Sequence, residues 1–127
     1  MASDGVLAVY PPCAASAAEA RELVTGLCVQ WGVEEICDDL ALVVTELVAN
    51  AIRHAGTDIA LSLQAIDGGV RVEVRDGSTR PLRPRAPRIA DEGGRGLLLV
   101  DALCHRYGVE AEPDGKRVWV ELLVEVA

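Results

Sequence analysis

The sequence predicts an α+β fold, a two-layer α/β sandwich, and three observations lead to it. Half of the 127 residues are hydrophobic, so the chain is long enough to bury the core of one domain. Some segments have the apolar spacing of helices, and shorter ones alternate polar and apolar residues as strands do. Neither internal repeats nor a linker interrupts the chain. We therefore expect a single domain over residues 1–127, with a mixed, mostly antiparallel sheet and three main helices on one face.

The first expected elements are a strand and a helix. Residues 6–10 have the composition of a short strand, which stops at Pro11. Ser16 is an expected N-cap, and Glu19, three residues later, completes a capping box. The helix that they open is predicted to end near residue 30.

A second helix and a hairpin are expected next. The helix is predicted from about residue 34 to residue 55, and Gly56 is a suitable glycine to follow its last turn. Residues 58–66 and 70–75 alternate polar and apolar side chains around a glycine turn, which predicts two antiparallel strands.

The remaining chain is predicted to hold a long loop, a third helix and a closing hairpin. Residues 76–94 are rich in Pro, Arg and Gly and have no periodicity, and loops of this length are usually functional. A helix is expected over 96–106, followed by strands at 107–111 and 117–126 around a turn at 113–115.

Charge and composition exclude several classes of function. The formal net charge of −8 argues against nucleic acid or an anionic membrane as a partner, because such binding rests on neutralising phosphates. Six arginines between positions 75 and 95 nevertheless form a positive island, which suits a small anion or an acidic partner. The four cysteines form no C-x-x-C pair, so reduced core thiols are expected in place of a zinc site. Without a signal-peptide pattern or a long apolar run, we expect a cytoplasmic protein.

The first chemical motif lies in the second predicted helix. Glu46 and Asn50 are four residues apart and therefore share one helix face, with Arg53 and His54 close to the same stripe. Asparagine costs a helix up to about 0.7 kcal/mol relative to alanine, so its place in an apolar segment invites a chemical explanation. A carboxylate base beside a neutral oxygen ligand suits a magnesium-nucleotide site. The alternative is an ordinary solvated helix face.

The second motif is Asp76, which closes an alternating strand and opens the long loop. A carboxylate in this place can accept a hydrogen bond from the exocyclic amine of adenine, a bond worth about 1.5–3 kcal/mol. Guanine would present an oxygen there, so the same contact would select the base. The alternative is a simple turn aspartate, which the following Gly77 also favours.

The third motif is a glycine cluster at the start of the third predicted helix, from Gly93 to Leu97. Glycines let backbone N–H groups approach phosphate oxygens, and the helix N-terminus adds partial positive charge. Arg95 can supply a guanidinium fork. The cluster matches neither the Walker A pattern nor the dinucleotide fingerprint, and flexibility of a lid would also explain it.

In this order the three motifs resemble those of the GHKL (Bergerat-fold) ATPases, and most of all the small anti-sigma-factor serine kinases of actinobacterial type. Residues 46–55 are similar to the family's N box, 74–78 to its first glycine box and 93–97 to its second. The resemblance spans about residues 16–124 and implies an ATP lid at about 77–95.

The resemblance also implies roles for individual residues. Asn50 would bind the Mg²⁺ that bridges the phosphates of ATP, Glu46 would be the general base, and Asp76 would hold the adenine amine. The other implied nucleotide contacts are Arg53, His54, Ser78, Gly93, Gly94, Arg95, Gly96 and Leu97.

Two positions depart from the family's pattern. Ser78 stands where the first glycine box usually has glycine. On the last strand, Arg117 is expected at a position that is usually Thr or Ser. A long cation there would either crowd the adenine pocket or point outward.

The function implied by the resemblance is that of an ATP-dependent serine/threonine protein kinase. Its substrate would be an anti-sigma antagonist of the STAS type, and it would control transcription by partner switching with a sigma factor, as a monomer or as a homodimer. One alternative is a non-catalytic module that binds ATP and sequesters a partner. Another is an adaptor that uses the proline repeat of Pro81, Pro84 and Pro87 as a polyproline ligand.

Overall fold

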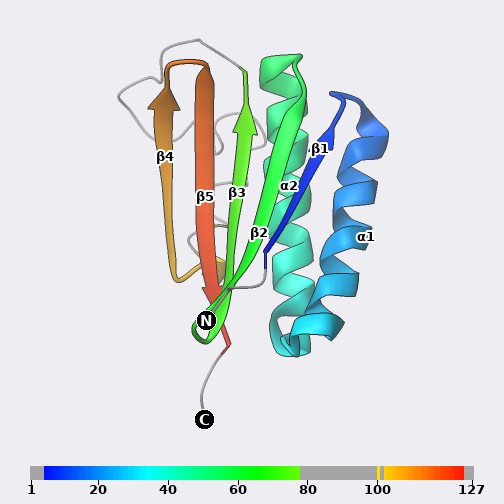
Figure 1. The fold of residues 1–127 in the computed structure, drawn as a ribbon, viewed down its shortest axis with the longest axis vertical. Coiled ribbons are helices and arrows are strands. Elements are labelled where there is room, and N and C mark those ends of the chain that lie inside the picture. The colour runs from blue at the N-terminus through cyan, green and yellow to red at the C-terminus, as the bar shows by residue number, and fades with distance from the viewer. Residues whose placement is uncertain (1–4, 78–99, 101, 125–127) are drawn as a thin grey trace.

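An antiparallel five-stranded sheet forms one layer of the molecule, and two long helices form the other (Figure 1). The fold comes from a computed structural model that describes residues 5–77, 100 and 102–124. The strands are β1 (Gly5–Tyr10), β2 (Ile59–Ile66), β3 (Gly69–Asp76), β4 (Arg106–Glu112) and β5 (Gly115–Leu123), in the spatial order β1-β2-β3-β5-β4. The helices are α1 (Ala14–Trp31) and α2 (Cys37–Ala55), with a short 3₁₀ turn, η1 (Glu34–Ile36), between them.

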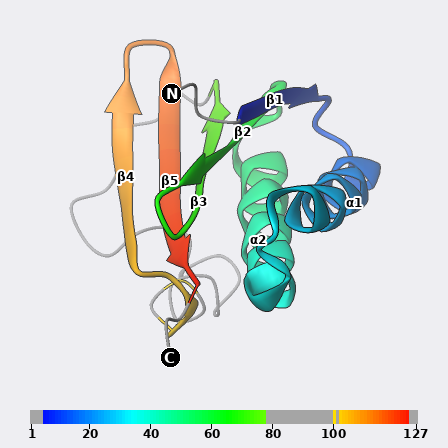
Figure 2. The ribbon, with the colours of Figure 1, turned by 60° about the horizontal axis from the view of Figure 1, so that its bottom comes forward.

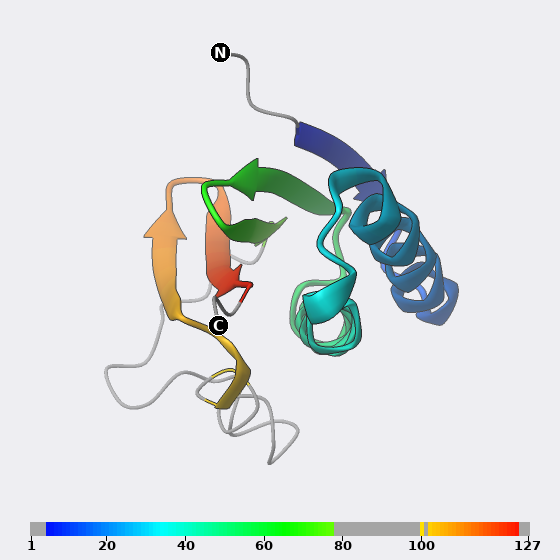
Figure 3. The ribbon, with the colours of Figure 1, turned by 90° about the horizontal axis from the view of Figure 1, so that it is seen from below.

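Both helices lie on the same side of the sheet, as Figures 2 and 3 show. Helix α2 packs against β2 and β3, and α1 packs against α2 on the side away from β4. The predicted fold class is therefore confirmed, and all four pairings between the described strands are antiparallel. Of the third predicted helix, Val100, Ala102 and Leu103 are helical, and the rest lies outside the described residues or after the helix has ended.

The core lies between the two layers and follows from strand alternation. Val70, Val72 and Val74 of β3 are buried, whereas the residues between them face the opposite side. Strand β5 pairs Val118 and Val120 with these valines, so the apolar stripe continues across the sheet. The fully buried side chains are almost all Val and Leu, as expected from a sequence without Phe.

The helix ends show one confirmed prediction and one wrong one. Gly56 follows α2 with φ 65, in the left-handed conformation that glycine adopts most readily. Helix α1, however, begins earlier than predicted, with Cys13 as its N-cap. Ser16 is buried and its hydroxyl donates to the carbonyl of Pro11 at 2.6 Å, so it stabilises the turn before the helix and forms no capping box.

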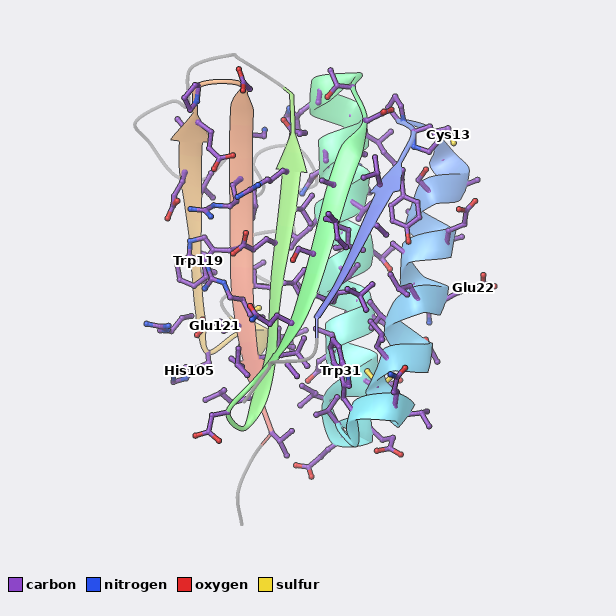
Figure 4. All side chains as sticks on the ribbon, viewed as in Figure 1. Cys13, Glu22, Trp31, His105, Trp119 and Glu121 are labelled. Atoms are coloured by element: carbon purple, nitrogen blue, oxygen red, sulfur yellow. The ribbon has the colours of Figure 1, made fainter. Side chains whose placement is uncertain are left out.

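The cysteines are free thiols in different surroundings. Cys28 is buried, and burial together with a hydrogen bond to Cys37 raises the pKa of its thiol to about 12. Cys13 is exposed where the chain passes from β1 to α1, so it does not fill the core (Figure 4). Within the described ranges, no helix is long and apolar enough to cross a membrane.

The face of the sheet away from the helices carries a network of charges. Glu121 is 8% exposed and accepts hydrogen bonds from Arg71 at 2.8 Å and from Arg106 at 2.9 Å. Burial alone would raise the pKa of Glu121, but the bonds from Arg106 and Arg71 outweigh it and lower the pKa below its usual range. The guanidinium of Arg71 also lies over the ring of Trp119, 4.3 Å from its centroid. Trp119 and Glu121 lie along β5 in Figure 4, and this network ties β3, β4 and β5 together.

Candidate functional site

Of the predicted site residues that the structure describes, Arg53, His54 and Asp76 lie at one end of the molecule, Asn50 lies about one turn further into α2, and Glu46 lies at the middle of that helix. Helix α2 ends and β2 begins at this end of the molecule, and β3 arrives antiparallel to β2, with Arg75 paired to Ala60 (upper part of Figure 1). The backbone N–H of Gly77 donates to Oγ1 of Thr57 at 2.8 Å. This bond joins the segment after α2 to the residue after Asp76, so the end of α2 lies next to the end of β3.

Helix α2 presents the predicted polar stripe. Leu40, Val44 and Val48, which a helical wheel puts on the side opposite Glu46, are buried. Glu46 and His54 are half-buried and Arg53 is exposed. The polar stripe therefore lies at the border between the buried and the exposed side of the helix, since Asn50 is buried and Arg53 is exposed.

Asn50 is the buried member of this stripe, with 6% exposure. Its Oδ1 accepts a hydrogen bond from Nη2 of Arg53. Its Nδ2 is buried and has no hydrogen-bond partner in the part of the chain that the structure describes. A buried amide with an unmade hydrogen bond costs about 1–3 kcal/mol. Such a group is explained when a ligand completes the site.

Asp76 ends β3 on the core side of the sheet, and its side chain is only 2% exposed. It lies opposite Lys116 in the register of β3 and β5, and Nζ of Lys116 is 4.0 Å from Oδ2 of Asp76. Gly115 passes so close that a Cβ there would lie 1.9 Å from the carbonyl oxygen of Asp76. The start of β5 thus packs tightly against the backbone of Asp76 and places Lys116 beside its carboxylate.

Arg117 points outward, which decides the question raised by the sequence. Strand alternation puts it on the face away from the helices, where it forms ion pairs with Glu73 at 3.5 Å, with Glu112 at 3.7 Å and with Glu110. These contacts raise the pKa of Arg117, the hydrogen bond to Glu110 most of all. Of the two alternatives that the sequence left open for Arg117, the outward one holds, and Lys116 is the cation that lies beside Asp76.

Two residues of this end were missed from the sequence. Lys116 was recoverable, because counting back from the apolar Val118 and Val120 puts it on their side of the strand. Thr57 left no such signal, since its contact with Gly77 depends on how two distant segments meet.

The remaining predicted contacts lie outside the described residues. They are Ser78, Gly93, Gly94, Arg95, Gly96 and Leu97, and most of the expected lid at 77–95 lies there too. The description resumes at Val100, which is 1% exposed in the core. In the described part of the chain, no group of three or more His, Cys, Asp or Glu residues could hold a metal ion.

Comparison with known proteins decides the family. Residues 10–122 match the family described as the histidine kinase-like ATPase domain. The chain belongs to this family. An uncharacterized protein of Streptomyces coelicolor is 39% identical to this histidine kinase-like ATPase domain over 82 residues, which cover 61% of this chain and 78% of the relative.

Membership of the histidine kinase-like ATPase family confirms the resemblance to GHKL ATPases and implies that the chain binds ATP, in general with Mg²⁺. The residues present fit these groups. The Nδ2 of Asn50 is a buried donor without a hydrogen-bond partner among the described residues, which suits a phosphate oxygen or a water, and Asp76 is a nearly buried acceptor. In nucleotide sites Mg²⁺ keeps several waters, and the phosphates and one or two protein side chains supply its other ligands. A site with Asn50 as the protein ligand is therefore chemically reasonable.

Proposed function

We propose that this ATP-binding protein is a serine protein kinase that phosphorylates an anti-sigma antagonist of the STAS type. Transfer of the phosphate would switch a sigma factor between partners and so control transcription. The observation that carries the proposal is the position of Glu46, a half-buried carboxylate one helical turn from the buried Asn50 and on the same face of α2.

The described residues would divide the work as follows. Asp76 would accept a hydrogen bond from the adenine amine and fix the base. Asn50 would hold Mg²⁺ through Oδ1, and the bound ion would neutralise phosphate charge. Glu46 would accept the proton of the substrate serine as its oxygen attacks the γ-phosphorus, and the bond from that phosphorus to the β–γ bridging oxygen would break to release ADP. Catalysis of this kind depends mainly on positioning and electrostatics, so few groups are needed.

Arg53 would have to turn away from Asn50 when the nucleotide binds. It now donates to the same Oδ1 that would hold the ion. Arg53 is exposed, so its guanidinium can move toward a phosphate at small cost. The guanidinium of Arg53 could thus donate to Oδ1 of Asn50 without nucleotide and to a phosphate oxygen when nucleotide is bound.

The second candidate is a non-catalytic module that binds ATP and then sequesters a partner protein. One observation favours it. Glu46 has no hydrogen-bond or ion-pair partner among the residues that the structure describes. Active-site bases are usually oriented by a neighbouring group, and a module that only binds would not need one.

Calorimetry with Mg-ATP tests the binding step. Asp76→Asn exchanges one acceptor oxygen for a donor, and we expect its affinity to fall by about 10- to 100-fold, the equivalent of a lost charge-assisted hydrogen bond. Asp67→Asn, in the exposed β2–β3 turn, is the matched control and should bind as the wild type does. Equal affinities for wild type and Asp76→Asn would remove Asp76 from the site.

Transfer of labelled γ-phosphate to STAS-type antagonists tests the catalytic step. Glu46→Gln should bind Mg-ATP as well as the wild type and should lose at least about 100-fold in transfer rate, the usual contribution of a positioned base. Undiminished transfer by Glu46→Gln would remove Glu46 as the base. ATP binding by a wild type that transfers to no antagonist would favour the non-catalytic module.

A further inference from the structure

Lys116 is the single lysine of the chain, and it lies beside the carboxylate proposed to bind adenine. Its side chain is 14% exposed, and Nζ is 4.0 Å from Oδ2 of Asp76. Both residues face the core side of the sheet, and they are direct partners in the register of β3 and β5. Neither the binding step nor the transfer step proposed above makes use of this ammonium group.

The position calls for a compact donor. A nearly buried carboxylate needs a compensating charge, and Lys116 supplies one. The distance of 4.0 Å is an ion pair but is longer than a direct hydrogen bond. An ammonium group has three donors on a flexible stem, so Lys116 can stay near Asp76 and also donate to a further acceptor.

Adenine carries such an acceptor next to its amine. The amine at position 6 is a donor, and the neighbouring N1 is an acceptor. A base that donates its amine hydrogen to Asp76 with its N1 edge toward the sheet presents N1 to the adjacent residue on the same side of the sheet. Within the register of β3 and β5, that residue is Lys116.

We propose that Lys116 is a second specificity-determining residue, which donates a hydrogen bond to N1 of adenine directly or through one water. This inference rests on the proposed ATP site at Asp76. Guanine in the same orientation presents an oxygen to Asp76 and an N–H to Lys116, so both contacts are mismatched. The pair would read two neighbouring atoms of the base, whereas Asp76 alone reads one.

The test compares ATP with 1-deaza-ATP, which keeps the amine but has C–H in place of N1. We expect wild-type protein with Mg²⁺ to bind ATP about 10- to 100-fold more tightly than 1-deaza-ATP, as for the loss of a hydrogen bond to a charged group. Lys116→Met keeps the length of the side chain without its donor, and we expect it to bind both nucleotides equally. Arg117→Met, on the opposite face of the same strand, should keep the wild-type ratio.

Three results would overturn the inference. One is equal binding of both nucleotides by the wild type while Asp76→Asn still weakens ATP, which would leave the ATP site in place without a role for Lys116. Another is a Lys116→Met variant that is weaker for both nucleotides but keeps their ratio, because the lysine would then only neutralise Asp76. The third is a wild type that binds neither nucleotide, and this result would reject the proposed ATP site itself. The comparison on wild-type protein needs no variant to fold.

Discussion

At the scale of single residues, Asn50 shows a conflict between stability and function. It is buried in the middle of α2, where asparagine is a poor helix former, and its Nδ2 has no partner in the described part of the chain. Neither property helps the chain to fold. Both are expected of a residue whose partner is a ligand, since functional sites often retain groups that cost stability.

Asn50→Ala should therefore bind Mg-ATP at least about 100-fold more weakly without losing stability. The variant removes the unpaired amide and gains up to about 0.7 kcal/mol in helix propensity, which together offset the lost bond to Arg53. Urea unfolding without nucleotide and calorimetry with Mg-ATP measure the two effects. Thr25→Ala, which removes a hydroxyl bond to the backbone of α1, is a control that should leave ATP binding unchanged. A clear loss of stability in nucleotide-free Asn50→Ala would show that the residue is structural.

Glu121 makes the opposite contribution, because its interactions are made within the protein. Glu121→Gln should lower the free energy of unfolding at pH 7 by about 1.5–3 kcal/mol, the value of hydrogen bonds to a charged group. The folded-state pKa of Glu121 is lowered, so its stabilisation is present above the unfolded-state pKa of about 4.3 and is lost as the pH falls through the folded-state value. The difference in the free energy of unfolding between wild type and Glu121→Gln should therefore shrink as the pH falls from 5 to below about 4. A difference that stays constant with pH would mean that the charge of the carboxylate contributes nothing to stability.

At the scale of elements, the sequence predicted those whose pattern is local. The alternation of β3 and the Gly56 end of α2 follow from periodicity and from a single left-handed residue, so they were found without a structure. The start of α1 was misplaced because the hydroxyl of Ser16 had two acceptable partners, and only the turn at Pro11 decides between them. Lys116 was missed for a related reason, because the resemblance directed attention to Arg117 and a shift of one residue changes the face of a strand.

The contact between β4 and β5 offers a test of this packing. A Cβ on Gly108 would lie 2.6 Å from Nε1 of Trp119, so the indole covers the bare backbone of β4. Gly108→Ala should push the ring away, weaken its stacking on Arg71 and cost about 1–3 kcal/mol, as overpacking does. Urea unfolding and near-ultraviolet circular dichroism would measure the loss. Gly26→Ala on α1 meets nothing within 4 Å and should instead stabilise by up to about 1 kcal/mol. Unchanged stability of Gly108→Ala would show that Trp119 does not rest on this glycine.

At the scale of the whole molecule, the two faces of the sheet have separate tasks. One face packs on the helices and ends in Asp76 and Lys116, while the other holds ion pairs that cross three strands. The candidate site collects residues from α2, β3 and β5, which are distant in the sequence. A ligand that contacts all three would bind only the folded chain, so its binding would stabilise the fold as a whole.

Mg-ATP should therefore raise the global stability by an amount that its own affinity determines. At 100 times the dissociation constant the free energy of unfolding should rise by about 2.7 kcal/mol, and at 1,000 times by about 4.1 kcal/mol. Urea unfolding at increasing ATP concentration measures the rise. The dissociation constant comes independently from calorimetry, so the predicted rise has no adjustable parameter. At the same ATP concentrations the free energy of unfolding of Asp76→Asn should rise less, because its weaker affinity lowers the ratio of ATP concentration to dissociation constant. If wild type and Asp76→Asn gained equally, the stabilisation would come from ATP bound elsewhere, and the end of the fold where α2, β3 and β5 meet would not be the nucleotide site.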